Sequence, residues 1–148
     1  MAEFLNNNVQ SISPNGDAIF EENIGCAKGN ILFRPQTGQI LLRGGNGRFA
    51  RYQITFNGNI SIPEGGTPGA ISVALALGGS IIQTSKAIIT PTVADAYFNV
   101  TSTCIVDIPS CCCQNISVKN SSESATPATA PASTINMQNA NLVVTRIA

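Results

Sequence analysis

The heptapeptide RYQITFN, residues 51–57, decides the fold class of this chain. Its large apolar residues, Tyr52, Ile54 and Phe56, alternate with polar ones. Because successive side chains of a β-strand point to opposite faces, this period of two predicts a strand with one apolar and one polar face. We therefore expect residues 51–57 to cover a hydrophobic core from one side.

Short apolar runs of the same kind recur along the chain, and glycine and proline turns separate them. The other predicted strands are residues 8–13, 18–20, 31–33, 39–43, 60–62, 69–77, 81–89, 97–108, 114–120 and 134–148. About ten short strands with such turns predict a single all-β domain over residues 1–148, built as an antiparallel jelly-roll sandwich.

The predicted strand GAISVALAL, residues 69–77, has a large face and a small face. Ile71, Val73, Leu75 and Leu77 share one side, whereas alanine and serine fill the other. Side chains that small would let another sheet or another subunit approach closely. The candidate residues for the core or for a trimer interface are Tyr52, Ile54, Phe56, Val73, Leu75 and Leu77.

The composition restricts the classes of partner. Charged residues make up 11% of the chain, against about 25% in soluble domains, and the net charge is zero. With no basic patch the chain lacks the electrostatic signature of nucleic-acid binding, and no run of about 18 apolar residues predicts a membrane span. So few charged residues leave much of a monomer's surface uncharged, and we expect copies of the chain to cover it by associating with one another.

The chain contains no histidine, the commonest general base and metal ligand. Neither a Ser-His-Asp nor a Cys-His arrangement can therefore be built. We expect a protein that is not an enzyme and that uses no metal or cofactor.

The cysteines are the most unusual local feature: Cys26, Cys104 and the run Cys111, Cys112 and Cys113. Neighbouring cysteines would form strained bonds, because their Cα atoms lie about 3.8 Å apart, below the usual disulfide range. We expect part of the run to form a disulfide with a remote cysteine such as Cys26, or with another subunit. Free thiols are the alternative, and the spacing fits zinc sites poorly.

Two segments stand apart from the predicted strands. Residues 1–8 carry Phe4 and Leu5, which either form an exposed attachment arm or pack beneath the first strand. Residues 121–133, rich in Ser, Thr, Ala and Pro, predict a flexible surface loop. The start of the chain has no basic residues or apolar run typical of a secretory signal, so we expect synthesis in the cytoplasm without a signal peptide.

Several segments occur in an order that resembles a known family: residues 7–11, 51–60, 71–79, 116–120 and 139–148. They are similar to the trimeric jelly-roll head domains of bacterial and phage collagen-like proteins, such as the exosporium collagen-like glycoprotein. The resemblance extends more distantly to the complement/tumour-necrosis-factor superfamily. It implies a homotrimer and a structural role, although no Gly-X-Y stalk precedes the domain in this sequence.

These observations lead to a functional expectation. We expect a non-enzymatic structural protein, a homotrimeric decoration or head-fibre protein on the outside of a particle, in the first place a phage capsid. Its partners would be its own copies and the virion surface. The alternatives are a module that binds a receptor or a cell-surface glycan, and a structural protein of a spore surface.

Overall fold

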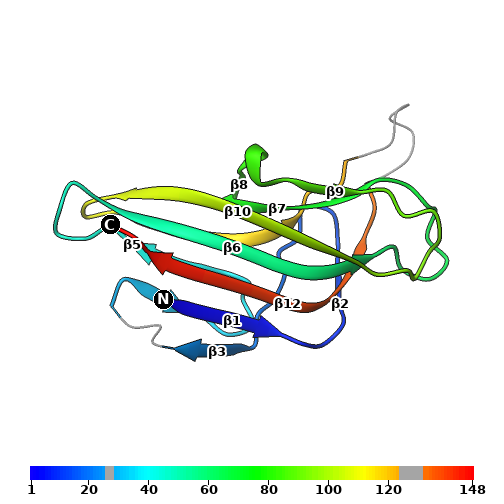
Figure 1. Ribbon diagram of the computed structural model, residues 1–148, viewed down its shortest axis with the longest axis horizontal. Helices are drawn as coiled ribbons and strands as arrows, with labels where there is room; N and C mark the ends of the chain where they lie inside the picture. Colours follow the sequence, from blue (N-terminus) through cyan, green and yellow to red (C-terminus); the bar gives the residue numbers. More distant parts are fainter. Residues whose placement is uncertain (26–28, 124–131) are drawn as a thin grey trace.

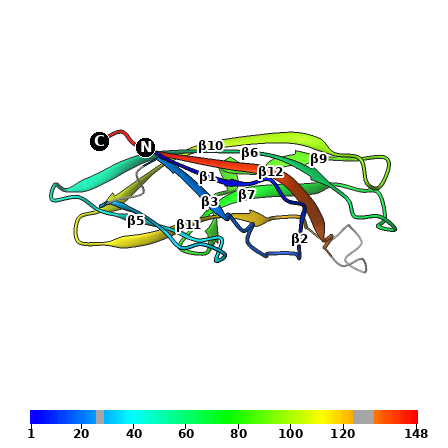
Figure 2. The same cartoon turned by 90° about the horizontal axis from the view of Figure 1, so that it is seen from below.

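The computed structural model describes residues 1–25, 29–123 and 132–148. Two antiparallel sheets lie face to face, and the described residues contain no helix beyond one 3-10 turn, Gln83–Ser85. Figure 2 shows the two layers from the side. The predicted all-β antiparallel jelly-roll sandwich is confirmed.

Sheet A has six strands in the order β10-β6-β12-β1-β3, and β2 also pairs with β12. The strands of sheet A are β1 (Ala2–Asn6), β2 (Gln10–Ile12), β3 (Glu22–Gly25), β6 (Phe49–Ser61), β10 (Phe98–Pro109) and β12 (Ile135–Arg146).

Sheet B has six strands in the order β4-β5-β11-β7-β8, and β9 also pairs with β7. The strands of sheet B are β4 (Ile31–Phe33), β5 (Ile40–Arg43), β7 (Ile71–Leu77), β8 (Ser80–Ile81), β9 (Ala87–Ile89) and β11 (Cys113–Asn120). The strands β5, β6, β7, β10, β11 and β12 alternate between the two sheets, as in a jelly roll.

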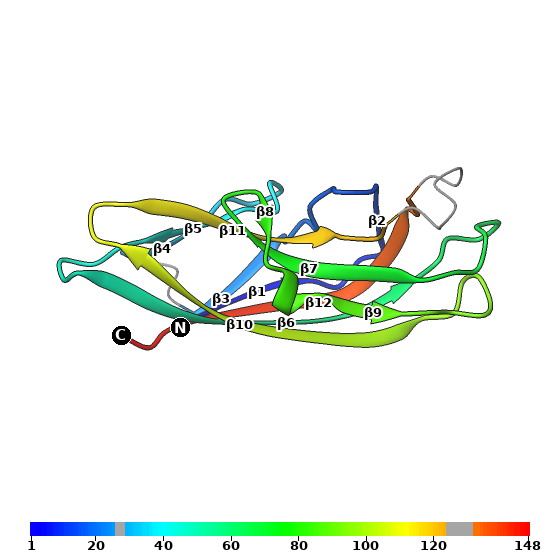
Figure 3. The same cartoon turned by 90° about the horizontal axis from the view of Figure 1, so that it is seen from above.

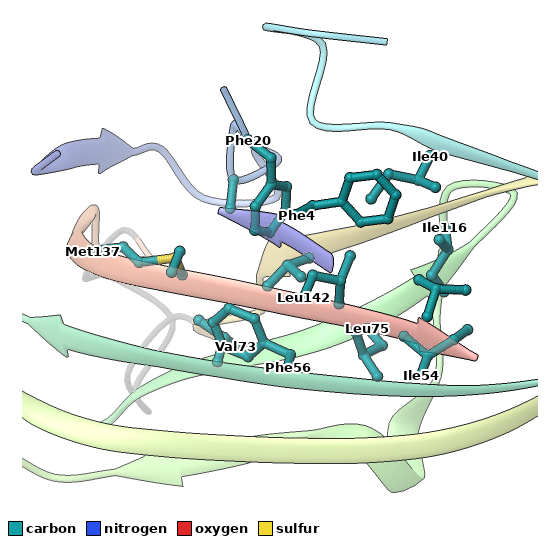
Figure 4. Packing of buried hydrophobic residues seen from close by; sticks show 14 of the residues in the cluster. Phe4, Phe20, Ile40, Ile54, Phe56, Val73, Leu75, Ile116, Met137 and Leu142 are labelled. Carbon is teal, nitrogen blue, oxygen red and sulfur yellow. The ribbon is translucent and has the colours of Figure 1, made fainter. Parts of the chain in front are cut away.

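Strand β6 shows why these residues form a sandwich. It lies between β10 and β12, and its even-numbered residues, including Tyr52, Ile54 and Phe56, are buried between the sheets. Burying each such side chain contributes about 1.5–3 kcal/mol. The hydroxyl of Tyr52 donates a hydrogen bond of 2.6 Å to the carbonyl of Arg43, which ties β6 to β5 of the opposite sheet. Figure 4 shows the core between the sheets.

A serine closes the edge of the sandwich where β10 and β7 approach. The Ser85 hydroxyl accepts a hydrogen bond of 2.9 Å from the backbone N–H of Leu75, in sheet B. The carbonyl of Ser85 accepts a hydrogen bond from the Ser102 hydroxyl, in sheet A. The strand region predicted over residues 81–89 consists of β8, the 3-10 turn that contains Ser85, and β9.

The structure corrects the expectation of an exposed arm at residues 1–8. Strand β1 pairs with both β12 and β3, and Phe4 is fully buried. The ring of Phe4 packs against Phe33 of sheet B, with 5.0 Å between the ring centroids. Phe4 therefore packs in the core, which was the second of the two alternatives. Leu5 is half-buried on the opposite side of β1.

The small face of β7 is also corrected. Ala74 and Ala76 are buried within the subunit and so cannot receive another one. The predicted flexible loop begins with two buried residues, because Ser72 binds the hydroxyls of both Ser121 and Ser122. Residues 124–131 of that loop lie outside the described residues.

In the part of the chain that the structure describes, no helix has the length and the apolar character needed to cross a membrane.

Candidate functional site

The outward side of β12, β6 and β10 forms a continuous surface in the middle and at one edge of sheet A. Strand register places its side chains in rows that cross the three strands, and none of them is buried. We call this surface the outer face of sheet A. Its rows are Gln138, Asn59 and Asn99; Asn141, Asn57 and Thr101; Val143, Thr55 and Thr103; and Thr145, Gln53 and Ile105.

Hydrogen bonds between β6 and β10 order this face. The Asn57 side-chain amide donates to Asn99 Oδ1 at 3.1 Å and to Thr101 Oγ1 at 2.7 Å. The hydroxyls of Thr55 and Thr103 lie 3.1 Å apart. Side chains that are already ordered lose little conformational entropy when a partner binds, so the face is preorganised for contact.

The rows of the outer face of sheet A contain no ionisable side chain, and the charges that border them are an ion pair at one end and Glu3 of β1 beside Asn141. At its end Arg51 holds Asp107 with two hydrogen bonds, of 2.7 and 2.8 Å. The hydrogen bond from Arg51 lowers the pKa of Asp107, so the carboxylate stays ionised and paired. Burying the rows themselves therefore dehydrates no ionised side chain of the face.

Large apolar side chains accompany the amides and hydroxyls. Ile105, within the face, is 60% exposed, and Phe49, beside Arg51 at its end, is 43% exposed. The Arg51 guanidinium lies 5.2 Å from the centroid of the Phe49 ring. Neutral polar groups around exposed isoleucine and phenylalanine are typical of surfaces that bind other proteins.

The far margin of sheet A is different because it is acidic. Glu3 and Leu5 point outward from β1, and register places them beside Ile24 and Glu22 of β3. The Asn141 side-chain amide donates a hydrogen bond to Glu3, which joins this margin to the outer face. Leu5, proposed from sequence as an attachment residue, therefore lies on a strand that is paired on both sides rather than on an arm.

The structure places most of the predicted core or trimer residues inside the subunit. Tyr52, Ile54, Phe56, Val73 and Leu75 are fully buried between the sheets. They are therefore unavailable to an interface between copies. Leu77, at the end of β7, is half-buried.

Sequence reasoning missed the outward neighbours of those residues. Gln53, Thr55 and Asn57 alternate with the buried side chains of β6, and the signal was present in the same heptapeptide. When the outward residues of a strand are mostly amides and hydroxyls rather than Lys or Glu, the strand lacks the charges that discourage contact with another chain.

The cysteines are distributed over two environments. Cys104 lies on the inner side of β10, half-buried, and burial raises the pKa of its thiol to about 11. Cys111, Cys112 and Cys113 are exposed at the turn between β10 and β11. None of these four residues forms a disulfide among the described residues, and Cys26 lies outside them, so its pairing stays a prediction.

The opposite end of the sandwich contains a cavity of about 760 Å³. Its lining includes Ile62, Ile71, Ile88 and the ion pair of Lys86 with Glu123. The hydrogen bond from Lys86 lowers the pKa of Glu123. Within residues 1–25, 29–123 and 132–148, no group of three or more His, Cys, Asp or Glu side chains is placed to hold a metal ion.

Comparison with known proteins supports the fold. No protein-family model matches the chain, and no curated protein matches its sequence. The globular domain of the zebrafish complement 1qA protein matches with a TM-score of 0.50 and 11% identity, over 96% of this chain and 94% of that chain. The expected complement-like jelly roll is thus confirmed as a fold.

Two other solved structures are less similar. The C-terminal domain of EclA, a sugar-binding protein, matches with a TM-score of 0.40 and 14% identity, over 95% of this chain and 79% of that chain. Arabinose-bound MgGH51 α-L-arabinofuranosidase matches with a TM-score of 0.42 and 12% identity, over 97% of this chain. The chain spans only 26% of that enzyme, and we base no inference on either likeness.

Proposed function

We propose that this protein is a non-enzymatic structural protein that works as a homotrimer, with its subunits joined through the outer face of sheet A. One observation carries the proposal: this face lacks ionisable side chains, is ordered by its own hydrogen bonds, and exposes Ile105. Such a surface binds a like surface without dehydrating an unpaired charge.

The size of the face is sufficient for a stable contact. Strands β10 and β12 have 12 residues each, and β6 has 13. At about 3.3 Å per residue and about 4.8 Å between strands, the three strands over their whole length, including the end that carries Arg51 and Asp107, cover on the order of 600 Å². This is comparable to the ~800 Å² that each partner contributes to a standard interface. The resemblance to trimeric head domains supports three copies.

The ionisable groups support a structural role rather than catalysis. The pKa shifts of Arg51, Asp107 and Glu123 belong to exposed ion pairs, and those of Tyr52 and Cys104 have burial as their main cause. Among the described residues, none of these shifts arises from a nucleophilic side chain placed beside a general base. The chain contains no histidine to supply one.

We place the trimer on the outside of a particle, in the first place a phage virion, with a spore surface as the alternative. The low charge content and the resemblance to head domains of collagen-like proteins support this location. Because Phe4 is buried, we place the contact with the particle on a face or an end of the trimer rather than on residue 4.

One observation favours a second function, the binding of a glycan or receptor. The cavity of about 760 Å³ has the size of a small-molecule site. The chain segment 62–71, which supplies much of its lining, lies at the end of the sandwich away from the two chain ends (Figure 3). Titration calorimetry with a panel of oligosaccharides tests this function, and the absence of heat at millimolar sugar would remove it.

The test of the main proposal is the mass of the purified protein in reducing buffer. Light scattering at micromolar concentration is expected to give three times the chain mass of 15.4 kDa. A monomer mass would overturn the homotrimer. Immunogold labelling of intact virions and spores from the source then decides the particle, and labelling of neither would overturn the surface location.

A further inference from the structure

The turn between β10 and β11 presents three consecutive thiols. Cys111, Cys112 and Cys113 are all exposed, at the same end of the sandwich as the two chain ends (Figure 3). We call these residues the cysteine turn. Exposed thiols that contribute nothing to the core are unusual, because free cysteine is among the most buried residue types.

Backbone hydrogen bonds hold the cysteine turn in place. The N–H of Cys112 donates to the carbonyl of Pro109 at 3.1 Å, and the N–H of Gly44 donates to the carbonyl of Cys112 at 2.9 Å. A Cβ on Gly44 would lie 1.9 Å from the Pro109 carbonyl oxygen, so only glycine permits this approach. Cys111 itself has a φ of 62°. The turn therefore presents its thiols from a fixed backbone.

The described residues contain no partner thiol within reach. Bonds between adjacent members of the turn would be strained, since their Cα atoms lie about 3.8 Å apart. Cys104 lies five positions before Pro109, the last residue of β10, and at about 3.3 Å per residue this part of the strand alone spans about 17 Å, against the limit of about 7 Å for a disulfide. The experiment below tests Cys26 directly.

Symmetry places the cysteine turns of different copies at the same end of the assembly. In a ring of identical subunits, equivalent atoms lie at the same height along the symmetry axis. Strand β10 is the edge strand of the outer face of sheet A and runs directly into the turn. If that face joins the copies, their turns lie at the same end of the assembly.

We propose that the cysteine turn forms disulfides between neighbouring copies of this chain and so locks the homotrimer covalently. This inference rests on the proposed function, because it requires the copies to associate through sheet A. Two thiols per copy are enough for each subunit to bond both of its neighbours.

The bond-forming step requires an oxidant, which we assign to the class of small-molecule disulfides, such as oxidised glutathione. One turn thiolate attacks the oxidant, forms a mixed disulfide and releases one reduced glutathione. A thiolate of the next copy then displaces the second glutathione. The two protons lost by the cysteine thiols end on the two molecules of reduced glutathione. Arg43, Arg48 and Arg146 lie around the turn, and their positive charge attracts this anionic oxidant.

The test uses the full chain, purified with reductant and then exposed to oxidised and reduced glutathione. After alkylation with N-ethylmaleimide, electrophoresis in SDS without reductant is expected to show a covalent trimer that dithiothreitol converts to monomer. The double variant Cys111→Ser, Cys113→Ser keeps one turn thiol, and is expected to stop at covalent dimer. The triple variant, which also carries Cys112→Ser, is expected to remain monomer.

Cys26→Ser and Cys104→Ser are the matched controls, and both are expected to retain the covalent trimer. A wild-type band at monomer mass, or loss of the trimer with Cys26→Ser, would overturn the inference. Covalent species larger than trimer at micromolar concentration would also overturn it, because the bonds would then join separate assemblies. Light scattering in reducing buffer shows independently whether the non-covalent trimer itself has failed.

Discussion

The outward sides of the two sheets differ in what covers them. On sheet B, Ser72 is hydrogen-bonded to Ser121, and Ala74 lies opposite Lys119, so this chain encloses its own small residues. On sheet A, the amides, hydroxyls and Ile105 of the outer face are accessible. The small side chains on sheet B are covered by other parts of the same chain. The ordered, neutral surface of sheet A is the one that remains accessible to a partner.

Charge follows the same division. Lys119 pairs with Asp17 at 3.1 Å on the outward side of sheet B, and Lys86 pairs with Glu123 beside its edge. The rows of the outer face of sheet A contain no charge, and they are bordered by the pair of Arg51 and Asp107 at one end and by Glu3 beside Asn141. Because Lys119 lies within the outward side of sheet B, whereas the charges of sheet A lie only around its rows, sheet B is expected to face solvent.

The largest expected effect separates the two sides of sheet A at adjacent residues. Phe4→Ser is expected to lower the free energy of unfolding by about 3–5 kcal/mol, because it leaves a cavity against Phe33 and buries a hydroxyl. Leu5→Ser, on the outward side of β1, is expected to cost well under half as much. Urea denaturation of both variants measures the difference, and equal losses would contradict the placement of Phe4 in the core.

A smaller effect compares the outward sides of the two sheets with an isosteric change. Asn57→Asp introduces a carboxylate into every copy of the outer face of sheet A, and is expected to weaken association by about tenfold, or about 1.4 kcal/mol. Asn115→Asp makes the same change on sheet B, where the amide of Asn115 contacts Gln39, and is expected to leave association unchanged.

Sedimentation equilibrium at low and high salt measures the association of both variants. Because the added carboxylates repel one another, salt is expected to recover part of the loss caused by Asn57→Asp. Equal weakening by the two variants would show that the outer face of sheet A has no special role.

The smallest expected effect concerns the inner side of β10. With its pKa raised to about 11, Cys104 is ionised in about one molecule in a thousand at pH 8, and iodoacetamide requires the thiolate. Timed alkylation followed by peptide mass mapping is expected to label the cysteine turn well before Cys104. Cys104 labelled as fast as the turn would mean that the sandwich opens at its β10 edge.

The fold class could be predicted from sequence because the alternation of apolar and polar residues over 51–57 corresponds to the alternation of buried and outward side chains in β6. The same pattern assigned Tyr52, Ile54 and Phe56 to a common side, where they are buried. Position Phe4 was harder, because its burial depends on pairing between β1 and β12, at opposite ends of the sequence. A local pattern contains no information about such a contact.

The outer face of sheet A could not be predicted from any one strand. Asn57, Asn99 and Asn141 come from three strands far apart in sequence, and only the register brings them together. The small residues of β7 suggested a different surface, because the segment that encloses them, including Ser121 and Ser122, has the composition of a loop. Composition described this segment correctly as polar but gave no partner for its hydroxyls.

The most direct test of association through sheet A is a pair of charge insertions at equally exposed isoleucines. Ile105, on sheet A, is 60% exposed, and Ile88, on β9 of sheet B, is 61% exposed, so Ile→Arg should perturb folding equally little at both. Light scattering in reducing buffer at micromolar concentration is expected to give monomer for Ile105→Arg and trimer for Ile88→Arg. Trimer for Ile105→Arg, or monomer for Ile88→Arg alone, would contradict the account.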